Sequence, residues 1–392
     1  MDKFKQFVDE FYKGNKKPKF FGIARVSLGQ ISKKPLNVSF ATFNWEENFG
    51  SFAVFASGLP KGTLDQNEIV HNIDRDFILH ALAKFDPYLK EALNDRQSHK
   101  NIQSILKVQE ILAANNFANP RDTSFQFIAF YEDLKPQSMQ VAFAKLYALS
   151  LGKAKPRSLN LESIFGLFEN VAWSKNTPYE LAYLRENELA LKLKGNYPAV
   201  DFVDKFPRYL MHIIPPFDNI RLLDSANTRL GASLASGYTQ MPGASYVNFN
   251  AGTLGACMNE GRISSSVIVG EGSDIGGGAS ILGVLSGGNS EPISIGKNCL
   301  LGANSVTGIS LGDGCIVDAG IAVLAGSVFS MDSKTAKEIK SMNASFVVKE
   351  DGFYKGKELS GLSGIHFRMD SKTGAMKALT NSKVFALNKS LH

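Results

Sequence analysis

The pattern of hydrophobic and polar positions divides the chain into two parts that meet near Phe206. Before that point, runs of β-branched and aromatic residues bounded by Gly, Pro and Asn predict strands over 20–31, 38–45, 51–56 and 125–131. Apolar residues near helical spacing predict helices over 77–89 and 102–111. We therefore expect a mixed α/β domain over residues 1–205.

A further helix start is predicted before Leu181. Thr177 would be the N-cap, Pro178 the first-turn proline and Glu180 the capping-box acid, followed by a leucine run that ends at Leu191.

After Phe206 helical periodicity stops and glycine recurs with a short period, which is typical of a repeat architecture. An aliphatic residue followed by glycine occurs at Leu230, Leu254, Val269, Ile275, Ile295, Leu301 and Leu311. Several of these intervals are multiples of six, and Val317 and Val323 continue the spacing from Leu311. Between these blocks the phase slips, which indicates loops or bulges.

Six residues fit one short strand and a tight corner, with the aliphatic residue inward and glycine at the bend. Three such sides would close one coil, and stacked coils would bury a continuous column of side chains. The sequence therefore predicts a parallel β-helix over residues 206–330. The fifth position of the repeat should also point inward, which assigns a packing role to Ala279, Cys299, Ser305, Cys315 and Ile321.

The repeat ends after Met331. A short helix is expected over 334–342, and strands are expected over 346–348, 352–354 and 365–369. We expect residues 331–392 to form a small β-rich cap that covers the open end of the coils.

Charge and cysteine content exclude several classes of protein. The 43 basic and 37 acidic residues give a formal charge of +6, too mild and too evenly spread for a nucleic-acid surface, although it favours small anionic substrates. The N-terminus is charged and no apolar stretch is long enough to span a membrane, so a cytoplasmic protein is expected. Three cysteines without CxxC spacing indicate neither a disulfide framework nor a zinc site.

The coil region contains no histidine, the residue that most often serves as a general base. The six histidines of the chain all lie outside residues 220–328: His71, His80, His99, His212, His366 and His392. This argues against a histidine-based site and against a three-histidine zinc site on the coils. An acidic residue is the alternative.

Glu260 is the acidic candidate. Counting six from Leu254 places Glu260 at an inward position, with Gly261 following as the repeat requires. A carboxylate against such a wall would have a raised pKa and would serve as base or nucleophile. A local register slip that returns Glu260 to solvent is the alternative. Glu271 and Asp313 follow glycine and are expected at solvent-facing corners.

Glycines cluster at 276–278 and 287–288, but they do not predict a phosphate-binding loop. Such a loop needs a GxGxxG motif between a strand and a helix, and that arrangement is not found around these glycines. Sharp corners, or room for a ligand beside the backbone, are the better interpretation. The extended pantetheine arm of CoA would suit such corners.

Several strings resemble the tetrahydrodipicolinate N-succinyltransferase family, in particular its actinobacterial branch. They are NAGTLGACMNEGRIS at 250–264, GSDIGGGAS at 272–280, LSGG at 285–288, ISIGK at 293–297, LLGANS at 300–305 and KELSG at 357–361. The resemblance covers roughly residues 221–371 and does not extend residue by residue into the first 200 positions.

The resemblance implies a left-handed coil and succinyl transfer from succinyl-CoA to tetrahydrodipicolinate, a step of lysine and diaminopimelate synthesis. It places Glu260 on the family's catalytic glutamate, described as forming an acyl anhydride; a general-base role is also chemically reasonable. It implies succinyl-CoA contacts at Arg262, Gly277, Ser280, Ala303, Asp318, Ala319, Gly326, Lys355, Arg368, Met369, Asp370 and Ser371. Some relatives have Glu where Asp318 stands.

The resemblance also implies a homotrimer with active sites between neighbouring coils. Some relatives hold magnesium with acidic residues near the trimer axis, but residues 226–244 contain neither Asp nor Glu, so no such metal is expected. Two other hypotheses stay open. One is an acyltransferase with another acyl donor or acceptor amine, and the other is a non-catalytic coiled scaffold that would not bind CoA.

Overall fold

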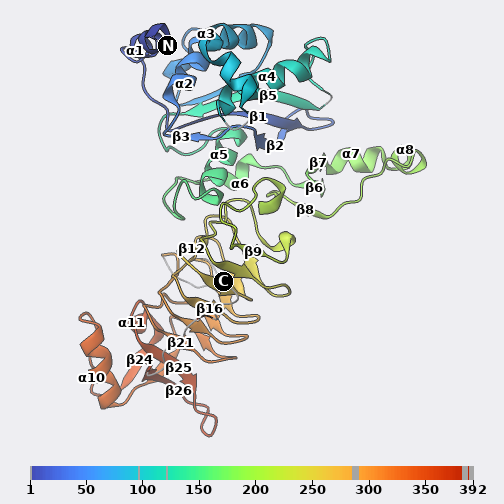
Figure 1. The fold of residues 1–392 in the computed structure, drawn as a ribbon. Coiled ribbons are helices and arrows are strands. Elements are labelled where there is room, and N and C mark those ends of the chain that lie inside the picture. The colour runs from blue at the N-terminus through green and yellow to red at the C-terminus, as the bar shows by residue number, and fades with distance from the viewer. Residues whose placement is uncertain (1, 96–97, 121, 285–290, 382–386, 388–392) are drawn as a thin grey trace. The chain divides into compact units, whose positions relative to one another are not determined.

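The computed structural model describes residues 2–95, 98–120, 122–284, 291–381 and 387 (Figure 1). The chain forms two compact units, one of Met1–Lys145 with Asn160–Pro207 and one of Leu146–Leu159 with Arg208–His392. Helix α5 (Met139–Ser150) belongs in part to each. Within the described ranges, no helix combines the length and the apolar character that crossing a bilayer requires.

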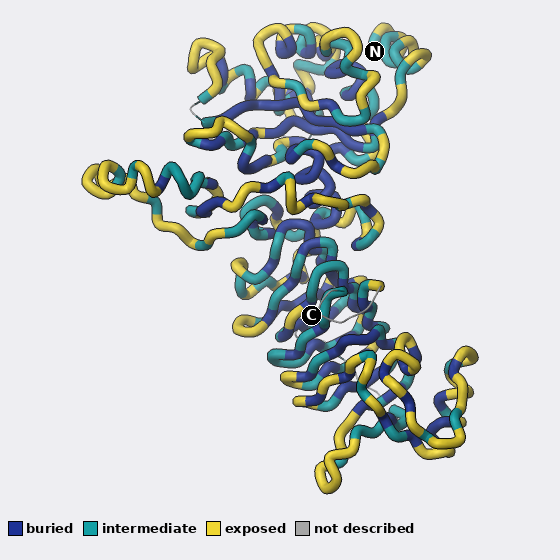
Figure 2. Tube along the Cα trace, turned by 180° about the vertical axis from the view of Figure 1, so that it is seen from behind, coloured by how far each residue is buried: buried dark blue, intermediate teal, exposed yellow. Residues whose placement is uncertain are grey.

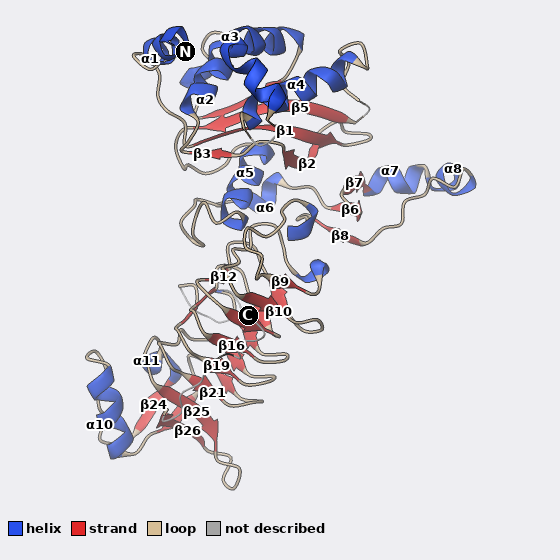
Figure 3. Cartoon of the chain, in the orientation of Figure 1, coloured by secondary structure: helices blue, strands red, loops and turns tan. Residues whose placement is uncertain are grey.

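The first unit contains an antiparallel sheet covered by helices, as expected for an α/β domain. Its strands run in the order β2-β1-β5-β4, with β3 paired to β1, and their bounds are β1 (Phe20–Leu28), β2 (Pro35–Phe40), β3 (Asn44–Trp45), β4 (Glu68–Asn72) and β5 (Thr123–Phe130). The helices lie on one face of the sheet and are α1 (Asp2–Phe11), α2 (Phe49–Ser57), α3 (Arg75–Asn94) and α4 (Lys100–Ala113) (Figure 3). Phe21, Phe55, Phe77 and Phe127 meet in the core between the two layers.

Residues 51–56 were expected to be a strand, and that prediction is wrong because they lie in α2. Phe52 to Ala56 are all buried, so the helix shows no polar face from which a helical period can be read. A short apolar run of this kind fits a buried strand equally well.

The capping box predicted at Thr177 is also wrong. Strand β7 (Thr177–Glu180) pairs with β6 (Val171–Ser174), which also pairs with β8 (Phe202–Asp204). The helices α7 (Leu181–Glu186) and α8 (Glu188–Leu193) follow, and α6 (Ile164–Leu167) precedes the hairpin. The Glu180 carboxylate accepts hydrogen bonds from the backbone of Ile31 and Ser32 instead of capping a helix, because pairing with β6 holds this segment extended.

The second unit contains three parallel sheets whose strands alternate along the chain. Sheet 1 holds β9 (Arg221–Leu222), β10 (Tyr238–Gln240), β13 (Cys257–Asn259), β16 (Ser273–Ile275), β19 (Leu300–Leu301) and β21 (Ile316–Val317). Sheet 2 holds β11 (Tyr246–Val247), β14 (Arg262–Ile263), β17 (Ser280–Ile281), β20 (Val306–Thr307) and β22 (Ala322–Val323). Sheet 3 holds β12 (Gly252–Thr253), β15 (Ile268–Val269) and β18 (Ser294–Ile295).

The inward positions of these strands form the core that the repeat predicted. Figure 2 shows buried and more exposed residues alternating along the stacked strands. The aliphatic positions from Val269 to Val323 are buried, and so are the small residues of the fifth position: Ala279, Cys299, Ser305, Cys315 and Ile321. Cys257 is buried as well, and all three cysteines are free thiols.

The inward position assigned to Glu260 by counting six from Leu254 is wrong by one residue. Leu254 is 57% exposed, and the inward residues are its neighbour Thr253 at 2% and Asn259 at 0%. From Asn259 the next inward residue is Ile263, only four positions later, because a two-residue corner separates β13 from β14. A shortened interval also accounts for a phase slip later in the chain, since Leu300 pairs with Ile316, 16 positions later, where three repeats of six require 18.

The C-terminal part continues sheet 1. Strand β25 (Ile365–Met369) pairs in parallel with β21 and antiparallel with β26 (Met376–Thr380), and β23 (Val328–Ser330) and β24 (Phe353–Lys355) extend the sheet. The edge of β21 is therefore covered. Helix α10 (Ser333–Met342) confirms the expected helix, and α11 (Gly356–Leu359) follows β24. The strand expected over 346–348 is absent, and Val347 there is 72% exposed.

Candidate active site

Glu260 lies at the two-residue corner between sheets 1 and 2. Its backbone N–H donates to Ile275 O at 2.8 Å, and its carbonyl accepts from the N–H of Gly278 at 3.1 Å. These bonds hold the backbone while the side chain is half-buried rather than inward. The expected position against the interior wall is therefore corrected: the register slip places the half-buried Glu260 at the corner between the two sheets.

Gly261 makes this tight corner possible. A Cβ atom on Gly261 would lie 2.3 Å from the carbonyl oxygen of Ala279, at the neighbouring corner between β16 and β17, so no larger residue fits without moving backbone. The Glu-Gly pair is thus explained by close approach of two backbones, which the repeat pattern alone did not show.

Glu260, Gly277, Ala303 and Ala319 stack at successive corners between sheets 1 and 2, and we call them the corner column. Backbone hydrogen bonds of 3.1, 2.9 and 2.9 Å join Gly278 to Glu260, Asn304 to Gly277 and Gly320 to Ala303. Below the carboxylate the column carries only hydrogen or a methyl group. A Cβ at Gly277 would lie 3.4 Å from Oε2 of Glu260, so the glycine borders the carboxylate and leaves the backbone beside it open.

Arg262 and Ser280 are paired residues on the outer face of sheet 2, next to the corner column. Nε and Nη2 of Arg262 donate to Oγ of Ser280 at 3.0 and 2.6 Å. Arg262 is exposed, so this bond orients the guanidinium without burying it. A cation two positions after Glu260 suits an anionic ligand that lies along the column.

Asp318 lies next to the corner column, one residue before Ala319, and its backbone N–H donates to Phe367 of the C-terminal strand β25. Oδ1 of Asp318 lies 2.6 Å from Nε2 of His366, and Oδ2 lies 3.7 Å from Nε of Arg368. His366 was counted among the histidines but set aside, because it lies outside residues 220–328. The alternation of buried Ile365 and Phe367 with His366 was a readable signal for a strand, but its pairing with β21 was not.

The other predicted residues fall into two groups. Gly326 lies between β22 and β23, and Lys355 ends β24 opposite Val328 of β23. Gly356 N donates to Ser327 O at 2.7 Å, which brings Lys355 close to the segment that contains Gly326. Met369 ends β25 opposite Met376, and Asp370 and Ser371 follow it in the turn before β26. A hydrogen bond from Lys377, at 2.6 Å, lowers the pKa of Asp370. The string at 285–288 lies outside the described residues.

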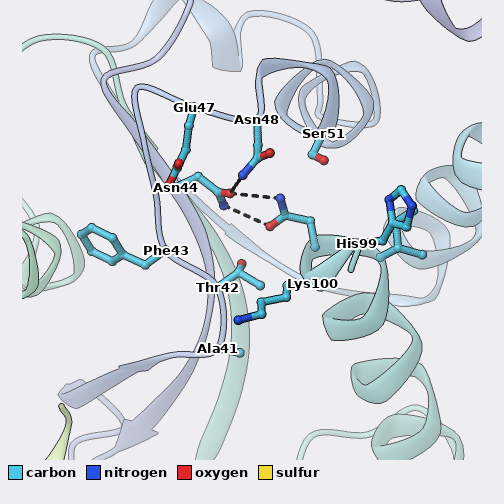
Figure 4. A pocket seen from close by; sticks show the side chains of 11 residues that line it. Ala41, Thr42, Phe43, Asn44, Glu47, Asn48, Ser51, His99 and Lys100 are labelled. Carbon is cyan, nitrogen blue, oxygen red and sulfur yellow. Dashed lines mark hydrogen bonds between the residues drawn. The ribbon is translucent and has the colours of Figure 1, made fainter. Parts of the chain in front are cut away.

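The first unit contains a cavity of about 530 Å³ that holds none of the predicted residues. It is lined by polar side chains near the starts of α2 and α4, as Figure 4 shows. Asn44 and Asn101 exchange amide hydrogen bonds of 3.0 Å, and Asn48 donates to Asn44 at 2.7 Å. These amides satisfy one another, and the ionisable residues Glu47, His99 and Lys100 also line the cavity.

Three family models match the chain in succession. One described as tetrahydrodipicolinate N-succinyltransferase N-terminal matches residues 2–166, and one described as the middle part of that enzyme matches residues 168–208. A third, described as a hexapeptide repeat of succinyl-transferase, matches residues 292–325.

Curated relatives are similar over the whole chain. A 2,3,4,5-tetrahydropyridine-2,6-dicarboxylate N-succinyltransferase of Helicobacter pylori is 55% identical and covers 100% of both chains. One of Campylobacter jejuni is 52% identical over 97% of this chain and 95% of its own. A Campylobacter jejuni crystal structure described as a 2,3,4,5-tetrahydropyridine-2-carboxylate N-succinyltransferase superposes with a TM-score of 0.89, at 50% identity and 98% coverage of both chains.

These relatives do not support the expected likeness to the actinobacterial branch, because the similarity is to Helicobacter and Campylobacter proteins. The similarity also extends through the first 200 residues, where no resemblance was recognised.

Proposed function

The chain belongs to the tetrahydrodipicolinate N-succinyltransferase family, and we propose that it transfers a succinyl group from succinyl-CoA to tetrahydrodipicolinate. The product would be N-succinyl-2-amino-6-oxopimelate, in lysine and diaminopimelate synthesis. The observation that carries this proposal is the corner column: a half-exposed carboxylate above a succession of Gly and Ala corners that an extended thioester can approach.

We assign the chemistry to Glu260. One water adds across the ring C=N bond of the acceptor, and the ring opens to a ketone and an amine. The amine nitrogen attacks the thioester carbonyl, a C–N bond forms, the C–S bond breaks, and Glu260 takes the amine proton and returns it to the departing thiolate. Attack by the carboxylate itself, through a mixed anhydride, would use the same residue.

The remaining contacts of succinyl-CoA would follow sheet 2 and its borders. Backbone groups of Gly277, Ala303 and Ala319 suit the amides of the pantetheine arm, since their small side chains let a ligand reach the main chain. Arg262 with Ser280, and the cations Lys355 and Arg368, suit the succinyl carboxylate and the phosphates. Asp318, Gly326, Met369, Asp370 and Ser371 are assigned to the same ligand through the family.

We further propose that the three parallel sheets close into a left-handed β-helix capped by residues 331–392, and that three chains assemble with active sites between neighbouring coils. The strand order and the column of buried, inward-pointing side chains support this closed arrangement. The left-handedness and the trimer are inferred from the family. The absence of Asp and Glu from 226–244 favours assembly without a metal held by that stretch. A cytoplasmic location stays the expectation for such an enzyme.

Glu260→Gln tests the proposal, with Glu271→Gln as the matched control because Glu271 occupies an exposed corner of the same unit. Release of free CoA thiol in the presence of acceptor should fall by about 10²- to 10⁴-fold in the first variant and stay near normal in the second. Normal turnover by Glu260→Gln would refute the mechanism. Turnover with a different acyl-CoA or amine in a screen would favour the broader acyltransferase hypothesis. A calorimetric titration without heat on adding CoA or succinyl-CoA would favour the scaffold.

A further inference from the structure

The outer face of β25 carries two charged or polar side chains beside the end of β21. Ile365 and Phe367 are fully buried, so His366 and Arg368 point to the opposite face of the strand. β25 pairs with β21 so that His366 stands opposite Ile316 and Phe367 opposite Val317. Asp318, the residue after Val317, is thereby brought between His366 and Arg368.

Asp318 is held at its backbone and at one carboxylate oxygen. Its N–H donates to Phe367 O at 2.9 Å, and Nε2 of His366 lies 2.6 Å from Oδ1. The side chain of His366 is only 14% exposed, whereas that of Asp318 is 40% exposed. A short hydrogen bond to a charged acceptor, made by a nearly buried ring, fixes the direction of the carboxylate.

Arg368 forms an ion pair with the same carboxylate, but it makes no hydrogen bond to it. Nε and Oδ2 are 3.7 Å apart, beyond hydrogen-bonding distance, and the Arg368 side chain is 49% exposed. Lys377, opposite Arg368 on β26, is engaged by Asp370 at 2.6 Å. A carboxylate released from His366 would turn toward Arg368, because paired N–H donors of a guanidinium favour two-point binding of a carboxylate.

We propose that His366 is a positioning residue for the acyl-CoA donor. It holds Oδ1 of Asp318, so that Arg368 stays available to an anionic group of the donor and Oδ2 stays available to an N–H of the pantetheine arm. This inference rests on the proposed function, since it concerns the same acyl-CoA site. It adds a histidine from the C-terminal strand to a site whose coils carry none.

The test compares His366→Phe, which removes the donor, with His366→Gln, whose amide reaches a similar distance. His366→Phe should raise KM for succinyl-CoA about tenfold, equivalent to about 1.4 kcal/mol, with kcat within about twofold of normal. His366→Gln should restore most of the affinity. A role confined to folding would lower the melting temperature and leave KM of the folded enzyme unchanged.

An unchanged KM in folded His366→Phe, or a fall in kcat alone, would overturn the inference. If His366→Phe does not fold, His366→Asn replaces it, because its shorter amide should not reach Oδ1 and should also raise KM. Failure of the proposed function would look different: wild-type enzyme would not bind CoA, or Glu260→Gln would turn over normally. Failure of the His366 inference leaves both of those results as expected.

Discussion

The three glycines at 276–278 provide a sharp test of the corner column, because neighbouring positions should respond to the same methyl group in different ways. Gly278 has φ of 71°, in the left-handed region, whereas Gly277 does not. An alanine at Gly278 would also place Cβ 2.3 Å from Oδ1 of Asn304. At Gly277 the added Cβ would make an ordinary contact, 3.4 Å from Oε2 of Glu260.

The magnitudes follow from these geometries. Gly278→Ala should lower the free energy of unfolding by about 1–2 kcal/mol for the left-handed backbone, plus the cost of moving Asn304. Gly314 has φ of 67° and open space around its Cβ position, so Gly314→Ala isolates the backbone cost. Gly277→Ala should leave stability unchanged or raise it by up to about 1 kcal/mol. Its methyl covers one side of the carboxylate, so turnover should fall about 10- to 100-fold.

Urea unfolding midpoints and thiol-release rates measure the two effects separately. The expected outcome is that Gly277→Ala loses activity with normal stability, while Gly278→Ala and Gly314→Ala lose stability. Full activity of Gly277→Ala would show that the space beside Glu260 is not used by substrate. A Gly277→Ala variant less stable than Gly278→Ala would refute the assignment of backbone strain.

Two further predictions concern buried ionisable side chains. The side chain of Lys145 is fully buried and pairs with Asp133 at 2.7 Å. Lys145→Met should leave that carboxylate without its cation and lower the free energy of unfolding, measured by urea titration, by about 3–5 kcal/mol. An unchanged urea midpoint would show that the ion pair makes no net contribution to stability. Burial lowers the pKa of His212 from 6.5 to about 3, so between these pH values the unfolded chain binds a proton that the folded chain does not. The free energy of unfolding should therefore fall by up to about 1.4 kcal/mol per pH unit as pH drops from 6.5 toward 3. Urea midpoints measured across this range should fall less steeply for His212→Gln.

Local patterns predicted much of the fold. The strand expected over 365–369 matches β25, and the helices expected over 77–89 and 102–111 lie within α3 and α4. Each has a side-chain period that repeats over its own length, so no distant residue is needed to recognise it. The α2 helix was missed because burial on all sides erases that period.

The site was predicted less completely than the fold. Glu260 and its neighbours were recognised as a sequence motif of the family. Their inward or outward positions, however, were assigned by counting from Leu254, an exposed residue that resembles an inward aliphatic one in sequence. Which residues point inward after Asn259 depends on the two-residue corner at Glu260 and Gly261. This corner requires glycine, because the backbone at Ala279 passes close to Gly261. That approach is a contact between coils and has no local signature.

By itself, the sequence determined the six-residue period, the buried aliphatic column and the glycine-rich corners, because alternation and backbone freedom are properties of neighbouring residues. Only the tertiary structure decided that Glu260 stands at the corner between two sheets and that His366 meets Asp318. Both depend on hydrogen-bond register between separate strands, and the pairing of Ile316 with His366 joins segments 50 positions apart. Packing selects that register, and nothing local encodes it.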